Sequence, residues 1–188
     1  MDKPSYLGLL NAIANGESAA ECYLDAWIAV CTRDDVKGIL STVARREGEH
    51  GKSFAKRIDE LGFCVQPRPD ARQADKMAIA ASCTFSDLEK FELLELGTAE
   101  RTNTARNGRD VFAGMLDDVT IDIRTGELLG RYISEERDSG RLLRACRDAL
   151  AAERAECSTP EAAAAPDVEA RLARVERLLE EICARLPA

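Results

Sequence analysis

The stretch Leu40-Ser-Thr-Val-Ala-Arg-Arg-Glu-Gly-Glu-His-Gly-Lys-Ser-Phe-Ala-Lys-Arg-Ile-Asp-Glu-Leu61 decides the fold expected for this chain. It contains the only histidine, His50, three residues after Glu47. Residues three or four apart share one face of an α-helix, so both side chains fall within an otherwise apolar stripe. The members of that stripe are Val36, Leu40, Val43, Glu47, His50, Phe54, Ile58 and Leu61. We therefore expect a helix that turns a carboxylate and an imidazole toward the interior.

A carboxylate on an apolar face needs compensation. Its burial is costly unless an ionic partner, a hydrogen bond or a metal ion replaces the lost water. An inward-facing Glu-x-x-His pair supplies half of the ligands of one kind of carboxylate-bridged dimetal site. The rest of the sequence must then provide further inward acids.

The preceding segment, residues 5–31, is expected to form a first long helix with an acid on its apolar face. Apolar side chains recur there at three- and four-residue steps, and Glu17 falls in register with them. Glu21, one turn later, is a second acid on that face. A short polar turn begins at Thr32, so the second helix should run antiparallel to the first.

The region after the second helix is expected to cross over before a third long helix begins. The sequence Gln66-Pro-Arg-Pro-Asp70 interrupts regular structure, and a short helix is expected within residues 71–83. A capping box then opens a third helix over residues 86–116. Periodicity leaves two acids, Glu95 and Glu100, as alternatives for its inward position.

A fourth helix, over residues 129–150, forms an internal repeat with the second helix. When the two are aligned, Glu136 takes the position of Glu47. Ser139 takes the position of His50, and a neutral hydroxyl is a poor metal ligand. The second half of the repeat is therefore incomplete.

The same register also chooses between the two acids of the third helix. Extended to the first and third helices, it pairs Glu17 with Glu100, which favours Glu100 over Glu95. Asp138 could replace the missing histidine only if the fourth helix were rotated, because it lies about 100° from Ser139 on the helical wheel.

The bulk composition excludes several classes of function. The chain has 188 residues, and only 5% of them are aromatic, which favours a helical protein. Its net charge of −8 argues against nucleic acid as a partner. No apolar run approaches the roughly 18 residues that a membrane-spanning helix needs, and the first residues lack the layout of a signal peptide. Seven cysteines without Cys-x-x-Cys spacing indicate neither a disulfide framework nor a cysteine metal site. We expect a cytoplasmic protein without membrane or nucleic-acid partners.

The end of the chain is expected to stand apart from a helical domain at residues 1–155. Residues 156–166, rich in alanine and containing two prolines, are typical of a flexible linker. Residues 167–188 carry apolar side chains at alternating four- and three-residue steps, which is a short heptad pattern. This last helix would either fold back on the domain or join subunits into a homo-oligomer.

The segments Ala14-Asn-Gly-Glu17 and Arg46-Glu-Gly-Glu-His-Gly51, set in two helix pairs, resemble the ferritin-like superfamily and in particular its rubrerythrin-type branch. The resemblance covers about residues 5–150. It implies an all-α fold: an antiparallel four-helix bundle with a long crossover, to which this chain adds a C-terminal helix. It also implies two iron or manganese ions held between carboxylates and histidines. Because the rubredoxin-like cysteine module is absent, an enzyme of this kind would need a separate electron donor.

The resemblance also implies a role for each inward residue. By position, Glu17 would be a terminal ligand of one metal ion, Glu47 would bridge, and His50 would bind the same ion. Glu100 and Glu136 would be the counterparts in the other half. The missing second histidine leaves the occupancy of the second metal position in question.

Three functions follow as expectations. The leading one is a di-metal oxidoreductase of peroxidase type, which consumes hydrogen peroxide or dioxygen. The alternative is a metal-free or single-metal scaffold that acts through oligomerisation. Iron storage is disfavoured, because a linker and a heptad helix do not indicate a closed shell.

Overall fold

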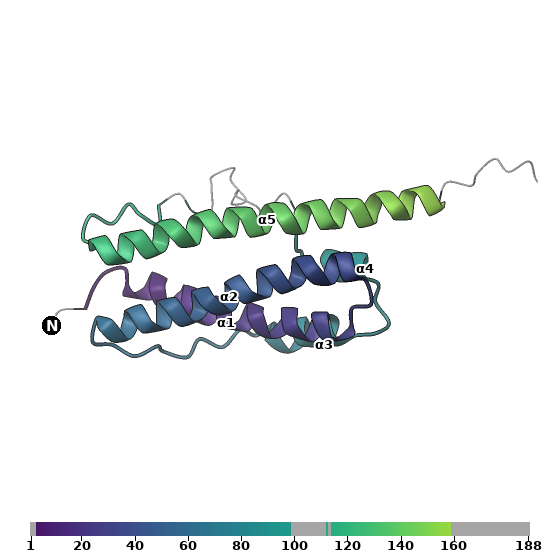
Figure 1. The fold of residues 1–188 in the computed structure, drawn as a ribbon. Coiled ribbons are helices and arrows are strands. Elements are labelled where there is room, and N and C mark those ends of the chain that lie inside the picture. The colour runs from purple at the N-terminus through teal and green to yellow at the C-terminus, as the bar shows by residue number, and fades with distance from the viewer. Residues whose placement is uncertain (1–2, 99–111, 113, 159–188) are drawn as a thin grey trace, which may run out of the picture. The chain divides into compact units, whose positions relative to one another are not determined.

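The computed structural model describes residues 3–98, 112 and 114–158, and within these ranges the chain is all-helical. Its helices are α1 (Leu7–Val30), α2 (Asp34–Glu60), α3 (Gln73–Ala81), α4 (Asp87–Leu93) and α5 (Ile123–Ser158) (Figure 1). The expected all-α class is confirmed, as are the first two long helices and the short helix within residues 71–83. The contacts described below lie within the compact unit that ends at Ala151. In these described ranges, no helix is both long and apolar enough to cross a lipid bilayer.

Helices α1 and α2 form a closely packed antiparallel pair joined by a short turn at residues 31–33. Two glycines on α2 permit this approach. A Cβ atom at Gly48 would lie 2.0 Å from Oε1 of Glu21. At Gly51, a Cβ atom would lie 2.5 Å from Oγ of Ser18. At Gly51 the backbone N of Ser18 would also lie only 3.1 Å away, so a larger residue there would push the helices apart, whereas at Gly48 the carboxylate of Glu21 could move aside.

Helix α5 lies alongside this pair, antiparallel to α2 and parallel to α1 (Figure 1). Asp122, immediately before α5, joins all three long helices at one end. Its carboxylate accepts hydrogen bonds from Tyr6 Oη at 2.9 Å and from Arg57 Nη2 at 2.8 Å. It also accepts from the hydroxyl of Thr125 at 2.6 Å and from the backbone N–H of Thr125 at 3.1 Å, and so caps α5.

The core consists of two apolar clusters with a polar layer between them. Cluster A comprises Tyr6, Leu7, Leu10, Ile13, Ala14, Phe54, Ile58, Leu129, Tyr132 and Ile133. Cluster B comprises Tyr23, Leu24, Trp27, Cys31, Val36, Leu40, Val43, Ala44, Ala80, Leu88, Phe91, Leu94, Leu96, Leu143, Cys146 and Leu150. Along each long helix, the positions between the clusters hold buried polar residues. These are Glu17, Glu47, His50, Glu136 and Ser139.

The crossover after α2 runs back along α1 and is held by two asparagines one helical turn apart. Asn11 Nδ2 donates to the carbonyl of Gln66 at 3.0 Å, and Asn11 Oδ1 accepts from the backbone N–H of Gln66 at 2.7 Å. Asn15 binds the same carbonyl at 3.1 Å and accepts from the N–H of Arg68 at 3.2 Å. The two asparagines thus pair the N–H and carbonyl of Gln66 and the N–H of Arg68, and hold this irregular segment against α1.

The prediction of a third long helix over residues 86–116 is wrong in its length, because α4 ends at Leu93. The capping box at its start is present as expected. After the end of α4, Glu95 and Gly97 both have positive φ, 55° and 65°. The N–H of Leu96 donates a hydrogen bond to the carbonyl of Phe91 at 2.9 Å. This left-handed turn closes the helix and buries Leu96 in cluster B.

The turn also removes Glu95 as an inward acid, since its side chain is 62% exposed. Glu100, the favoured alternative, lies outside the described residues. Helix α5 continues to Ser158, and the rest of the expected linker and the expected helix at residues 167–188 also lie outside them.

We predict that Asp122→Asn lowers the free energy of unfolding by about 1–2 kcal/mol, because Arg57 and Tyr6 lose a charged acceptor that is itself partly solvated. Urea denaturation at neutral pH measures this difference. Asp59→Asn is the matched control, because Asp59 is exposed on α2 and should leave stability unchanged.

The same variant has a predictable pH dependence. Burial acts to raise the pKa of Asp122, but hydrogen bonds from Thr125, Tyr6 and Arg57 outweigh it and hold that pKa well below its usual range. The stabilisation is therefore complete above about pH 4, the pKa of an unfolded aspartate, and is lost as the pH falls through the lower folded-state pKa. A stability difference that persists undiminished in strong acid would contradict this role.

Candidate metal centre

The polar layer between the two apolar clusters gathers acids from all three long helices around the single histidine. Glu17 comes from α1, Glu47 and His50 from α2, and Glu136 from α5. Glu17 and Glu47 are each 8% exposed and His50 is 4% exposed. The helical stripes identified in the sequence therefore do face one another, and the carboxylates lie where water is largely excluded.

Three atoms of this layer point at one common space. Oε2 of Glu17, Nδ1 of His50 and Oε1 of Glu136 lie within 4.8 Å of one another. The Nδ1 atom is 3.2 Å from the Glu136 oxygen and 3.8 Å from the Glu17 oxygen. All three atoms are buried and make no hydrogen bond, and the two contacts to Nδ1 are ion pairs only when the imidazole is protonated. Buried polar atoms are rarely left unpaired, so this triad has the donor set and the unmet need that a cation would satisfy.

The outer nitrogen of the histidine is held by an acid that the sequence analysis missed. Nε2 of His50 lies 2.7 Å from Oε2 of Glu135, whose other oxygen accepts from Arg131 Nε at 2.9 Å. A carboxylate can only accept, so it fixes the proton on Nε2 and leaves Nδ1 to face the triad when the ring is neutral. Metal-binding histidines commonly have such a carboxylate on the second nitrogen.

Glu135 escaped prediction because it lies off the inward stripe of α5. One residue from Glu136, it points about 100° away and reaches His50 from the side. The sequence feature that could have indicated it is the adjacent pair Glu135-Glu136, preceded by Arg131 one helical turn before Glu135.

Tyr132 holds Glu17 in the same manner as Glu135 holds His50. Its hydroxyl donates to Oε1 of Glu17 at 2.9 Å, which leaves Oε2 for the triad. Its ring packs edge-on against His50 with 5.0 Å between centroids. Burial and the neighbouring carboxylates raise the pKa of Tyr132, so the phenol keeps its proton and remains a donor.

The charges of the triad are strongly interdependent. Burial and the charge of Glu17 raise the pKa of Glu136, although His50 opposes them. Burial acts to raise the pKa of Glu17 as well, but His50 and the other hydrogen-bonding neighbours outweigh it and lower that pKa. Two adjacent buried acids thus titrate apart, as expected when both cannot be ionised without a cation between them.

The imidazole can itself supply positive charge when no metal is bound. Burial opposes protonation of His50, but the carboxylates of Glu136, Glu17 and Glu135 outweigh burial and raise its pKa to about 10. A protonated His50 would then neutralise the acids around it.

The structure brings together most, but not all, of the residues predicted as ligands. Glu17, His50 and Glu136 form the triad. Glu47, predicted as the bridging ligand, lies beside Glu17 within hydrogen-bonding reach. It does not contribute an atom to the triad. Glu100 lies outside the described residues. Glu21, the second acid expected on that face of α1, is 31% exposed and pairs with Lys52 at 3.3 Å.

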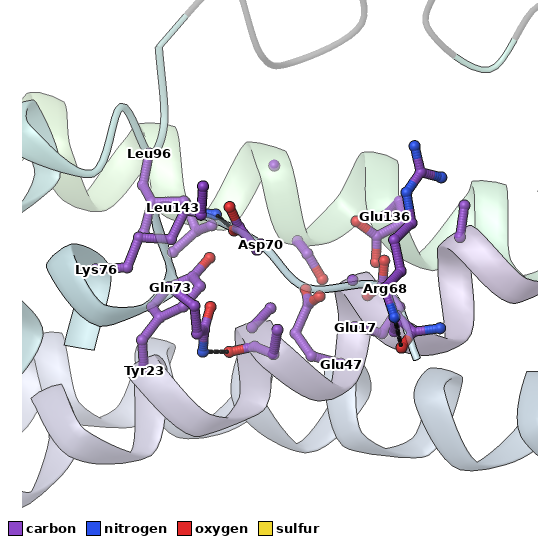
Figure 2. A pocket seen from close by; sticks show the side chains of 18 of the residues that line it. Glu17, Tyr23, Glu47, Arg68, Asp70, Gln73, Lys76, Leu96, Glu136 and Leu143 are labelled. Atoms are coloured by element: carbon purple, nitrogen blue, oxygen red, sulfur yellow. Dashed lines mark hydrogen bonds and ion pairs between the residues drawn. The ribbon is translucent and has the colours of Figure 1, made fainter. Parts of the chain in front are cut away.

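A cavity of about 860 Å³ adjoins the triad. Figure 2 shows Glu17, Glu47 and Glu136 grouped at one side of it, with Tyr23 and Leu143 toward the other. Small residues of α1 and α5 widen this space; they include Ala12, Gly16, Ala19, Ala20, Ser139 and Gly140. Among the described residues, open space therefore lies next to the three carboxylates.

No protein-family model, curated protein or solved structure matches this chain. Its chemistry must therefore be inferred from the geometry of the triad, its supporting residues and the adjoining cavity.

We predict that His50 stays protonated in the folded, metal-free protein until the pH approaches 10. Because the folded-state pKa is raised, its ion pairs stabilise the protein fully below about pH 6.5, the pKa of an unfolded histidine, and this contribution is lost as the pH rises through the folded-state value. A single histidine makes the measurement unambiguous by ¹⁵N NMR of the imidazole. The urea-unfolded chain is the control, and a folded-state pKa at or below about 6.5 would contradict the arrangement.

Proposed function

We propose that this protein binds a divalent metal ion, iron(II) or manganese(II), through Glu17, His50 and Glu136, and acts as an oxidoreductase on dioxygen or hydrogen peroxide. The observation that carries the proposal is the convergence of three buried ligand atoms, none with a hydrogen-bond partner, from three different helices. Two carboxylates and one imidazole suit these hard or borderline metal ions better than copper(I) or a thiolate-bound metal.

We further propose that the chain is a divergent member of the ferritin-like superfamily. The inward acid of α1, the Glu-x-x-His of α2 and the inward acid of α5 surround one space, as the resemblance implied. The third helix is the part that differs, since α4 ends at Leu93. The proposal therefore concerns the metal centre shared by α1, α2 and α5 and does not depend on a complete four-helix bundle.

Several side chains would prepare the centre for its metal. Glu135 holds His50 and Tyr132 holds Glu17, so the ligand atoms are oriented before an ion arrives. Clusters A and B exclude water from both ends of the polar layer. Glu47 lies beside Glu17, within hydrogen-bonding reach of it. Preorganised acidic ligands favour a bound cation over an empty centre.

When bound, iron or manganese would supply the one-electron chemistry that reduction of dioxygen or peroxide needs. The cavity beside Glu17 and Glu136 would admit the oxidant. Electrons for repeated turnover would come from a separate donor.

One observation favours a second candidate, a metal-free structural centre. The raised pKa of His50 means that a protonated imidazole can neutralise the neighbouring acids without a metal. The protein would then be a helical scaffold. The two candidates differ in whether an added metal displaces the proton of His50, because a ligating histidine must be deprotonated.

We predict that wild-type protein binds Mn²⁺ or anaerobic Fe²⁺ and that Glu136→Gln weakens this binding by more than about 100-fold, which exceeds the usual loss from a supporting residue. Equilibrium dialysis with metal analysis measures the affinity. At a free metal concentration of about 100 times Kd, binding should add about 2.7 kcal/mol to the stability of wild-type protein.

Glu127→Gln is the matched control, because Glu127 is exposed on the same helix and should bind metal like wild type. The Fe²⁺-loaded wild-type and control proteins should consume dioxygen or peroxide, whereas Glu136→Gln should not. Wild-type protein that binds no more metal than Glu136→Gln, with His50 still protonated in excess metal, would establish the metal-free scaffold instead.

We also predict that Glu135→Ala lowers metal affinity by about 10–100-fold, because His50 loses the acceptor that fixes its proton on Nε2. Isothermal titration with Mn²⁺ measures the change. Glu49→Ala is a suitable control, since the Glu49 side chain is 56% exposed and makes a long ion pair with Arg131 at 3.7 Å. Equal affinities for Glu135→Ala and wild type would show that the outer nitrogen plays no part in binding.

A further inference from the structure

The half of the polar layer that corresponds to a second metal position is built differently from the triad. The internal repeat places Ser139 where the first half has His50. Ser139 is only 2% exposed and lines the same cavity as Glu47 and Glu136. Its hydroxyl accepts a hydrogen bond from Nη1 of Arg46 at 3.2 Å. At the position of the missing ligand, a positively charged side chain of the protein itself, Arg46, thus binds Ser139.

Arg46 is fixed in this half by more than one contact. Its Nη1 atom lies 2.8 Å from Oδ2 of Asp138, and its side chain is 26% exposed. Its charge also acts to lower the pKa of Glu136, so the guanidinium is close enough to be felt by the triad. A guanidinium is always charged and has no lone pair to donate. It therefore cannot bind a metal ion and would repel one placed beside it.

Asp138 does not restore the lost ligand. Its carboxylate is 39% exposed and is shared between Arg46 and Arg141, which donates to it at 2.9 Å. The rotation of the fourth helix that would turn Asp138 inward has therefore not occurred, and Ser139 holds the inward position.

Charge accounting among the described residues leads to the same result. The layer contains two buried carboxylates, Glu17 and Glu47, and the half-buried carboxylate of Glu136. With His50 neutral, one divalent ion offsets two of these three negative charges, and the guanidinium of Arg46, which also pairs with Asp138, offsets part of the third. A second divalent ion would leave an excess of positive charge in a poorly solvated interior, where such an excess is costly.

We infer that the centre holds one metal ion per chain, on the side of His50, and that Arg46 provides the positive charge that a second ion would bring. This inference rests on the proposed function. It replaces the pair of ions implied by the family resemblance with a single ion and an internal arginine.

The test is a count of bound Mn²⁺ ions by native mass spectrometry and metal analysis, with the protein saturated in Mn²⁺. Wild type should bind about one ion per chain, and its electron paramagnetic resonance spectrum should be that of an isolated Mn²⁺ rather than a spin-coupled pair. Two bound, spin-coupled ions would overturn the inference and leave the proposed function intact. No bound ion would overturn the proposed function and the inference with it.

Variants show whether Arg46 and Ser139 are the cause. The double variant Arg46→Gln/Ser139→His should approach about two ions per chain, because it removes the cation and restores the imidazole. Arg141→Gln/Ser139→His is the matched control. It keeps Arg46 and removes Arg141, the other partner of Asp138; the side chain of Arg141 is 71% exposed. This control should stay near one ion. Equal metal contents in two folded variants, checked by circular dichroism, would overturn the role assigned to Arg46.

Discussion

The structure depends on how it compensates three carboxylates that lie between two apolar clusters. Glu17, Glu47 and Glu136 come from different helices, and each would be far more stable in water than in this layer. Every unusual feature nearby supplies positive charge or a hydrogen bond to them. Tyr132 donates to Glu17, and Arg46 and His50 bring positive charge from α2. Such a layer is a poor way to stabilise a helical protein, since apolar residues of similar volume would serve as well or better. We propose that a ligand that needs those oxygens accounts for its presence.

The two halves of the internal repeat have separate roles under this account. In one half, an imidazole braced by Glu135 offers a nitrogen to the common space. In the other, a serine and an arginine occupy the corresponding volume. The asymmetry extends to the fold, because the third helix ends early and a cavity adjoins the acids on that side. Under this account the centre would hold one ion with coordination positions open toward the cavity, whereas the family resemblance implied two ions enclosed by four helices.

The inward residues of the long helices could be predicted from the sequence, and the extent of the third helix could not. Glu17, His50 and Glu136 each interrupt an apolar stripe of helical period, so their convergence followed once the helices were packed side by side. The helical period also continues past Leu93 toward Met115, yet the chain turns at Glu95 and Gly97. That turn is set by tertiary contact: a Cβ atom at Gly97 would lie 2.9 Å from the carbonyl oxygen of Leu143. The partners Glu135 and Arg46 were missed for a related reason. Each lies beside an inward residue, and its role depends on the rotation of α2 and α5 about their axes, which a single stripe does not reveal.

The central claim is that a cation belongs in the space shared by Glu17, His50 and Glu136. Anomalous X-ray scattering from crystals of Mn²⁺-loaded protein tests it most directly. The account predicts one peak about 2.0–2.3 Å from Nδ1 of His50 and from an oxygen of each of the two glutamates, with Nε2 still on Glu135. A peak confined to exposed carboxylates, or an ion held by Nε2, would contradict the account.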